Sequence, residues 1–131
     1  MNGISFGTWP SIRAVGCVLS LLAALAFTGE ALAVPEAPVS GTVTMLELGA
    51  KSCIPCKMML PIINALETEY KDKAAIVFID VWENPDQVKR FGIRSIPTQI
   101  FYDRQGKEFF RHEGFFDKSP IMEILDKLLA Q

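Results

Sequence analysis

Apolar residues form two short runs with a longer amphipathic stretch between them. Residues 42–50 (TVTMLELGA) and 74–82 (AAIVFIDVW) are brief, largely uncharged and rich in β-branched side chains, which is typical of buried strands. Residues 55–70 between them carry apolar side chains at the i, i+3, i+4, i+7 spacing of an amphipathic helix. The pattern therefore predicts a strand, a helix and a second strand in this half of the chain.

The rest of the pattern predicts four more elements. Residues 84–92 (NPDQVKRFG) predict a short helix, with Asn84 as its N-cap and Gly92 at its end. Residues 98–103 and 107–114 flank a turn and predict a β-hairpin, and residues 118–131 predict a final amphipathic helix. The expected order is β-α-β-α-β-β-α.

The N-terminal region has a different composition. Residues 14–27 contain no charge and follow Arg13, but they are shorter than the roughly 20 residues of a membrane-spanning helix. Residues 31–33 (ALA) then fit the small-x-small cleavage pattern. We predict a secretory signal over residues 1–33, cleaved after Ala33; the alternative is an uncleaved N-terminal membrane anchor. Both place the domain in the periplasm or otherwise outside the cytoplasm.

The predicted cleavage leaves a chain with one domain's worth of residues. Residues 34–41 (VPEAPVSG) predict a flexible leader, and residues 42–131 predict the folded domain. Because residues 1–33 hold one acidic and one basic group, the net charge of −2 is unchanged by cleavage. This near balance argues against nucleic acid or an anionic membrane surface as a partner.

Two cysteines remain after the loss of Cys17, and they lie in the segment KSCIPCK at residues 51–57. The spacing suits half of a zinc site, a structural disulfide or a redox-active dithiol. Zinc favours four ligands, and the only histidine, His112, brings the total to three at best, although copper(I) could use the two thiolates alone. We interpret His112 as a hairpin residue and expect no metal or cofactor. A cysteine pair at the first strand-to-helix junction favours the redox interpretation.

The position of each cysteine predicts its role. Unpaired N–H groups and the helix dipole at the start of a helix favour the thiolate form, so Cys53 is the expected nucleophile. Cys56 lies one turn further in and is the expected resolving thiol, which attacks the mixed disulfide formed by Cys53. Lys51 and Lys57 add positive charge nearby, unless they are simply solvated flanking residues.

Glu47 interrupts the first apolar strand six residues before Cys53. A carboxyl isolated in an apolar setting has a raised pKa, which suits a group that takes a proton from Cys56 and returns it. We predict this proton-transfer role for Glu47. The alternative is that the twist of the strand turns its side chain to solvent.

These residues together resemble the thioredoxin family. The similarity spans residues 42–131 and rests on CIPCK at 53–57, FID at 78–80, FGIRSIPT at 91–98 and HEG at 112–114. It implies an α/β, thioredoxin-like fold with a central mixed β-sheet flanked by helices and an abbreviated N-terminal edge. The family resemblance also implies a cis Ile96–Pro97 bond beside the dithiol, and a substrate groove bordered by Ile96, Pro97 and Gly114.

The sequence departs from the family pattern next to the cysteines. The pair encloses Ile54 and Pro55 instead of the family's Gly-Pro, and Ser52 stands where thioredoxins usually carry tryptophan. These changes bear on substrate preference and reduction potential.

The resulting functional hypothesis is an extracytoplasmic thiol–disulfide oxidoreductase that reduces protein disulfides and is expected to be a monomer. The alternatives are a disulfide oxidase or isomerase of the same fold, or a copper-carrying protein. The resemblance implies a membrane protein that relays electrons from cytoplasmic thioredoxin, with apocytochrome c or mispaired disulfides as acceptors.

Overall fold

The computed structural model describes residues 33–131, so the predicted signal or anchor lies outside the described residues. The elements follow the predicted order: β1 (Thr44–Gly49), α1 (Ile54–Glu69), β2 (Ala75–Asp80), α2 (Asp86–Arg90), β3 (Thr98–Tyr102), β4 (Glu108–Glu113) and α3 (Lys118–Leu129). None of the helices in this part of the chain combines the length and the apolar character needed to cross a bilayer.

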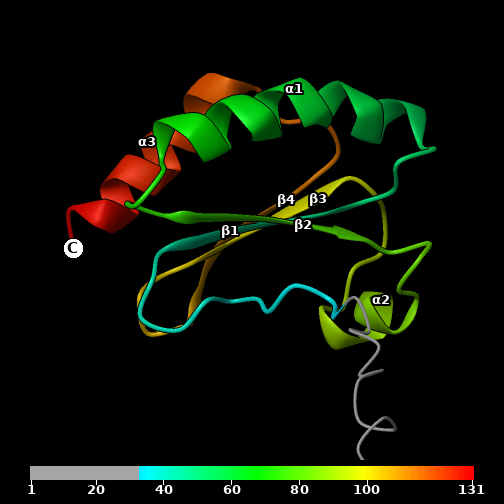
Figure 1. Cartoon of the computed structure of the whole chain (residues 1–131), viewed down its shortest axis with the longest axis horizontal. Helices are drawn as coiled ribbons and strands as arrows, with labels where there is room; N and C mark the ends of the chain where they lie inside the picture. The colour runs from blue at the N-terminus through cyan, green and yellow to red at the C-terminus, as the bar shows by residue number, and fades with distance from the viewer. Residues whose placement is uncertain (1–32) are drawn as a thin grey trace, which may run out of the picture. The chain divides into compact units, whose positions relative to one another are not determined.

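The strands form one mixed sheet in the order β2-β1-β3-β4. β1 pairs in parallel with β2 and antiparallel with β3, and β3 pairs antiparallel with β4. Figure 1 shows α1 and α3 on one face of this sheet and the short α2 on the other. This is the thioredoxin-like arrangement of a central mixed sheet flanked by helices.

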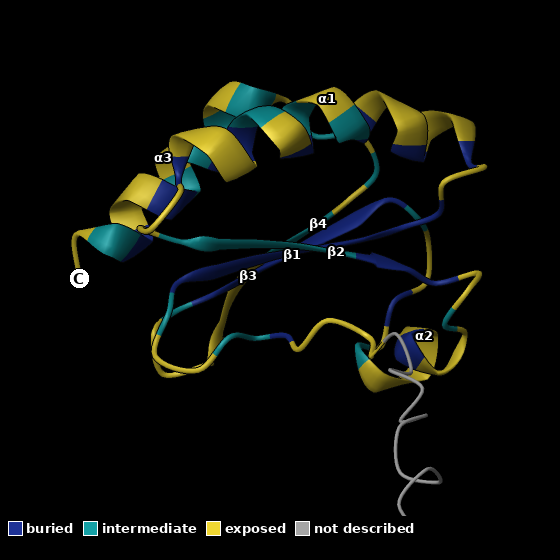
Figure 2. Ribbon diagram, in the orientation of Figure 1, coloured by how far each residue is buried: buried dark blue, intermediate teal, exposed yellow. Residues whose placement is uncertain are grey.

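The central strands β1 and β3 are buried on both faces because helices cover each face, whereas the edge strand β4 is largely exposed. Successive strand residues point to opposite faces, so Met45 packs in the cluster beneath α1 and α3, whereas Leu46 and Leu48 pack in the cluster on the α2 side. All of β1 is buried, as the dark ribbon in Figure 2 shows. Glu47 shares its face with Met45, which directs it toward α1.

The helix predicted over residues 84–92 is shorter in the structure. α2 covers Asp86–Arg90, and Pro85, not Asn84, occupies its N-cap position. The prediction of Asn84 as N-cap was wrong because its side chain is used in the turn after β2, where its Nδ2 donates to the Asp80 carbonyl at 2.9 Å. Asn84 therefore shapes the turn after β2.

Part of the segment predicted as a flexible leader contacts the domain. Ala37 is 1% exposed and packs in the cluster on the α2 side of the sheet. Its carbonyl accepts a hydrogen bond from Arg90 Nη2 at 3.2 Å, and the Val39 amide donates to Thr44 Oγ1 at 3.1 Å. The chain is thus anchored to the domain before the predicted boundary at residue 42.

Candidate active site

The two cysteines lie at the beginning of α1, directly after β1. Cys53 is the N-cap residue, its amide donates to the Ala50 carbonyl at 3.1 Å, and its own carbonyl accepts from the Lys57 amide at 3.0 Å. Pro55 is accommodated in the first turn because the amides there have no partner within the helix. Both thiols are free, and Cys53 is 8% exposed whereas Cys56 is 2% exposed.

Gly49 at the end of β1 faces Cys56 and the Phe78 ring. A Cβ atom at Gly49 would lie 3.4 Å from both Cβ and Sγ of Cys56 and 3.3 Å from the Phe78 ring. An alanine here would therefore contact Cys56 at van der Waals distance and require the Phe78 ring to shift by a few tenths of an ångström. The sequence analysis gave no role to Gly49.

Glu47 is fully buried on the α1 face of the sheet, with 0% exposure. Neither of its carboxylate oxygens has a hydrogen-bond partner among the described residues. Burial raises the pKa of Glu47 to about 8, against a smaller opposing effect of the Gln99 side chain. The alternative interpretation, a Glu47 turned to solvent, is wrong, because α1 and the neighbouring strands enclose this face of β1.

The Cys56 thiol is influenced by Glu47. Burial, the adjacent Cys53 sulfur and the charge of Glu47 raise the pKa of Cys56 to about 12, with burial the largest cause. A thiol with so high a pKa needs a base before it can act as a nucleophile. The carboxyl of Glu47 is a titratable group whose charge reaches this thiol.

Gln99 is a second buried polar residue that the sequence analysis missed. It lies opposite Glu47 in the β1–β3 pair and is 0% exposed. Its Nε2 donates to the Gly114 carbonyl at 3.2 Å, whereas its Oε1 has no partner among the described residues. The polar residue in the otherwise apolar strand TQIFY was the available signal.

The loop before β3 lies against the cysteines. Ile96 packs on the small cluster formed by Ala50, Cys53 and Cys56, and the Ile96–Pro97 peptide bond is cis. The Gly114 amide donates to the Pro97 carbonyl at 2.7 Å, and Gly114 has a φ of +97°, which favours glycine. The structure therefore brings Ile96, Pro97 and Gly114 together beside the dithiol.

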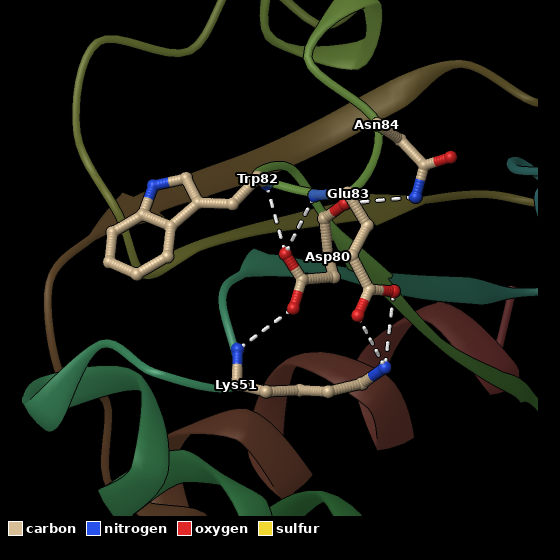
Figure 3. A network of polar contacts seen from close by, with 5 residues as sticks. All are labelled: Lys51, Asp80, Trp82, Glu83 and Asn84. Carbon is tan, nitrogen blue, oxygen red and sulfur yellow. Dashed lines mark hydrogen bonds and ion pairs between the residues drawn. The ribbon is translucent and has the colours of Figure 1, made fainter.

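Asp80 at the end of β2 holds the loop that leads to Cys53 (Figure 3). Its Oδ2 accepts from the Lys51 amide at 2.9 Å, and its Oδ1 accepts from the amides of Trp82 at 2.9 Å and Glu83 at 3.2 Å. Burial alone would raise the pKa of Asp80, but these amides together lower it. The sequence analysis placed Asp80 only at the end of a strand.

Lys51 and His112, two polar residues named in the sequence analysis, have partners away from the dithiol. The Lys51 ammonium forms an exposed ion pair with Glu83 at 3.0 Å, which Figure 3 also shows. His112 stacks on Phe116 at a centroid distance of 4.1 Å, as a β4 residue. Within residues 33–131, no three His, Cys, Asp or Glu side chains gather into a group that could hold a metal ion.

Comparisons with known proteins agree with this geometry. The thioredoxin family model matches residues 36–127. Thioredoxins of Staphylococcus aureus strains Mu50 and MW2 are each 35% identical over 94 residues, covering 72% of this chain and 89% of theirs.

Two solved structures are also similar. The Drosophila melanogaster germline-specific thioredoxin Deadhead has a TM-score of 0.60 at 30% identity, covering 67% of this chain and 82% of its own. The exposed lipoprotein thioredoxin of Streptococcus pneumoniae has a TM-score of 0.60 at 23% identity, covering 68% and 87%. The chain belongs to the thioredoxin family, and with its Cys53–Cys56 pair it is a thiol–disulfide oxidoreductase of the thioredoxin type.

Proposed function

We propose that this oxidoreductase works outside the cytoplasm as a reductant of protein disulfides, with Cys53 as nucleophile, Cys56 as resolving thiol and Glu47 as proton carrier. One observation carries the proposal: Cys53 lies at a helix N-cap, Cys56 is buried one turn further in, and the charge of the buried Glu47 carboxyl, which has no hydrogen-bond partner among the described residues, reaches Cys56. The extracytoplasmic location rests on the apolar segment at residues 14–27 and the cleavage pattern after it.

The reaction proceeds in two exchanges. The Cys53 thiolate attacks one sulfur of the substrate disulfide; a Cys53–substrate bond forms, and the other substrate sulfur leaves as a thiolate that takes up a proton. Cys56 then transfers its proton to Glu47 and attacks the Cys53 sulfur. The Cys53–Cys56 disulfide closes, the second substrate thiol is released, and two electrons have passed to the substrate.

Glu47 suits the proton transfer because of its pKa. A group that must accept a proton and later return it works best when its pKa lies near the operating pH. The value of about 8 for Glu47 meets this condition, whereas an exposed glutamate would be too weak a base.

Substrate binding is assigned to Ile96, Pro97 and Gly114. The backbone of Ile96 lies beside the cysteines and can pair with an extended substrate segment, as in strand addition to a sheet. We propose disulfide-containing proteins as substrates, with apocytochrome c among the candidates, and a membrane protein that relays electrons from cytoplasmic thioredoxin as the donor.

The test is insulin reduction together with single cysteine variants. We expect Cys53→Ser to abolish activity and Cys56→Ser to accumulate mixed disulfides through Cys53. Faster alkylation of Cys56 than of Cys53 at pH 6 would show that the two roles are assigned the wrong way round.

The direction of electron flow is tested by the reduction potential of the Cys53–Cys56 couple. A potential of about −270 mV supports a reductant, and a potential of about −120 mV would instead indicate an oxidase. Sequencing the N-terminus of the exported protein tests the location, with Val34 expected as the first residue.

A further inference from the structure

The buried side-chain atoms that lack a hydrogen-bond partner within residues 33–131 belong to two residues. They are Oε1 and Oε2 of Glu47 and Oε1 of Gln99. Both residues are 0% exposed. A buried polar atom without a partner costs free energy, so such atoms call for an explanation. In this part of the chain they are confined to one place in the sheet.

Glu47 and Gln99 are direct neighbours across the β1–β3 pair. Their Cα atoms are partners in the antiparallel register. Side chains of directly opposite residues lie on the same face of a sheet, with Cβ atoms about 4.5–5.5 Å apart. Two long side chains at this spacing can bring their polar ends together. Burial raises the pKa of Glu47, and the Gln99 side chain partly opposes this rise.

The orientation of the Gln99 amide is fixed by Gly114. Its Nε2 donates to the Gly114 carbonyl at 3.2 Å. Because a carbonyl can only accept, the nitrogen and not the oxygen of the amide faces Gly114. Oε1 is then left to accept a hydrogen bond, and Nε2 carries a second hydrogen that it can donate. The amide therefore offers both a donor and an acceptor to its neighbour Glu47.

A carboxyl group that carries a proton needs different partners in its two states. The carboxylate only accepts hydrogen bonds, whereas the carboxylic acid also donates one. A primary amide can serve both states, because its nitrogen donates to the carboxylate and its oxygen accepts from the acid. An aliphatic side chain at the same position could serve neither.

The other neighbours of Glu47 do not offer this combination. From α1, the Cys56 thiol is the group whose ionisation Glu47 affects, and it is the proton donor of the proposed reaction. On β2, the residue opposite Glu47 is Phe78. On β4, the residue opposite Gln99 is His112, whose ring is stacked on an aromatic side chain. His112 is thus one strand further from Glu47 than Gln99 is.

We infer that Gln99 is a positioning residue for the proton transfer: its amide donates to the Glu47 carboxylate before Cys56 gives up its proton and accepts from the Glu47 carboxylic acid afterwards. The proton passes from Cys56 Sγ to an oxygen of Glu47, and Gln99 neither gains nor loses a proton. The inference rests on the proposed function, since it concerns the same proton carrier.

The experiment compares the wild type with Gln99→Met, which keeps the length of the side chain and loses both hydrogen-bonding groups. The Glu47 carboxyl carbon, identified by its absence in Glu47→Gln, is titrated by ¹³C NMR in the oxidised protein, where neither cysteine titrates. Because the charged form loses the stronger hydrogen bond, the pKa of Glu47 should rise in Gln99→Met.

The same variant should resolve the mixed disulfide more slowly. We expect release of a Cys53-bound peptide to slow about tenfold at pH 7, as for the loss of one hydrogen bond to a charged group. The pH profile of release should move to higher pH, following the raised pKa of Glu47. In a Glu47→Gln background, Gln99→Met should cause no further loss of rate, because the carboxyl that it positions is gone.

Two control variants isolate the amide. Gln105→Met makes the same substitution at an exposed turn residue, and His112→Gln removes the titratable side chain opposite Gln99. Both should leave the titration of Glu47 unchanged. A further measurement needs no substitution: in the wild type, the side-chain amide ¹⁵N resonance of Gln99 should change with the same midpoint as the Glu47 carboxyl carbon.

The outcomes separate this inference from the function on which it rests. An unchanged or lowered pKa of Glu47 in Gln99→Met, a Gln99 amide that does not follow the Glu47 titration, or an equal loss of rate in the Glu47→Gln background would overturn the inference alone. Resolution at the wild-type rate in Glu47→Gln would instead overturn the proposed proton carrier, and the inference with it.

Discussion

At the scale of single residues, the unusual feature is a carboxyl group enclosed in the core. Glu47 lies on a strand that is buried along its whole length, and its oxygens lack partners among the described residues. Burying an ionisable group without partners lowers stability, and replacing it with an apolar side chain is often stabilising. Glu47 is therefore the position at which stability and the proposed proton transfer can be tested against each other.

The first prediction concerns stability. The pKa of Glu47 is raised from 4.5 to about 8 on folding, so the folded state holds a proton that the unfolded state loses between these values. Wild-type stability should therefore fall as pH rises through this window, by up to about 1.4 kcal/mol per pH unit. Glu47→Leu should lack this dependence and be more stable at pH 7 by about 1 kcal/mol or more. Urea denaturation at pH 5 and pH 8 measures both effects.

The matched control is Glu67→Leu, which changes an exposed glutamate on α1. It should show the same fall in stability with pH as the wild type. If Glu47→Leu also behaved like the wild type at both pH values, the pKa of Glu47 would be unchanged by folding.

The second prediction concerns turnover. Glu47→Gln keeps the shape of the side chain but removes the base for Cys56, so resolution of the mixed disulfide should slow by about a hundredfold at pH 7. The rate should rise steadily up to pH 10, because a growing fraction of the Cys56 thiol ionises without help as the pH approaches its pKa of about 12. Single-turnover release of a Cys53-bound peptide between pH 6 and pH 10 measures this. A profile parallel to that of the wild type would remove Glu47 from the mechanism.

At the scale of elements, the turn after β2 and the turn after β1 are joined through Asp80. Its carboxylate accepts hydrogen bonds from backbone amides of both turns, including the amide of Lys51, two residues before Cys53. Hydrogen bonds from backbone amides to a carboxylate hold a loop more firmly than an ion pair between two flexible side chains does. Asp80 therefore positions the loop before Cys53 and the backbone of Trp82 together.

The third prediction is that Asp80→Asn destabilises the protein by about 1–3 kcal/mol at pH 7, because charge-assisted hydrogen bonds become neutral ones. The pKa of Asp80 is lowered on folding, so its contribution is present above the ordinary pKa of aspartate and is lost as the pH falls through the lower folded value. The stability difference between variant and wild type should therefore shrink in acid.

Thermal and urea unfolding at pH 7 and pH 3 measure this difference. Asp72→Asn serves as control: Asp72 is exposed and has a φ of 63°, a conformation that asparagine also tolerates. A loss as large in Asp72→Asn as in Asp80→Asn would rule out a specific role for the Asp80 bonds.

At the scale of the whole molecule, the domain extends further toward the N-terminus than the hydrophobic pattern suggests. The family model begins at residue 36, and Ala37 is buried against the α2 face of the sheet. The segment 34–41 is short and poor in periodic apolar residues, so its sequence resembles that of a linker. Its contacts depend on Arg90 and the sheet, which lie far along the chain.

The fourth prediction follows from these contacts. A chain beginning at Thr42 should be less stable than one beginning at Val34 by about 1–2 kcal/mol, because it loses the Ala37 burial and the hydrogen bond from Arg90. A chain beginning at Glu36 is the control, since the residues removed are exposed, and it should match the longer chain. Urea unfolding of the three chains measures this, and equal stabilities would support the leader as first predicted.

Much of the fold was predictable because its signals are local. The element order followed from apolar periodicity, and the position of Cys53 at a helix start followed from the boundary between two such patterns. The N-cap of α2 was not predictable in the same way. Asn84 is a good cap by composition, but the Asp80 carbonyl engages its side chain in the folded turn.

The sequence by itself determined the element order, the family and the cysteine pair, because helix periodicity, strand alternation and the C-x-x-C spacing are read within a few residues. Only the tertiary structure decided that Glu47 is buried on the same face as α1, and that Asp80 reaches Lys51, 29 residues away. It also decided that Ile96, some forty residues further along the chain, packs against the two cysteines. These contacts depend on strand order and register, which bring together residues far apart in the sequence. Local sequence patterns do not predict such contacts.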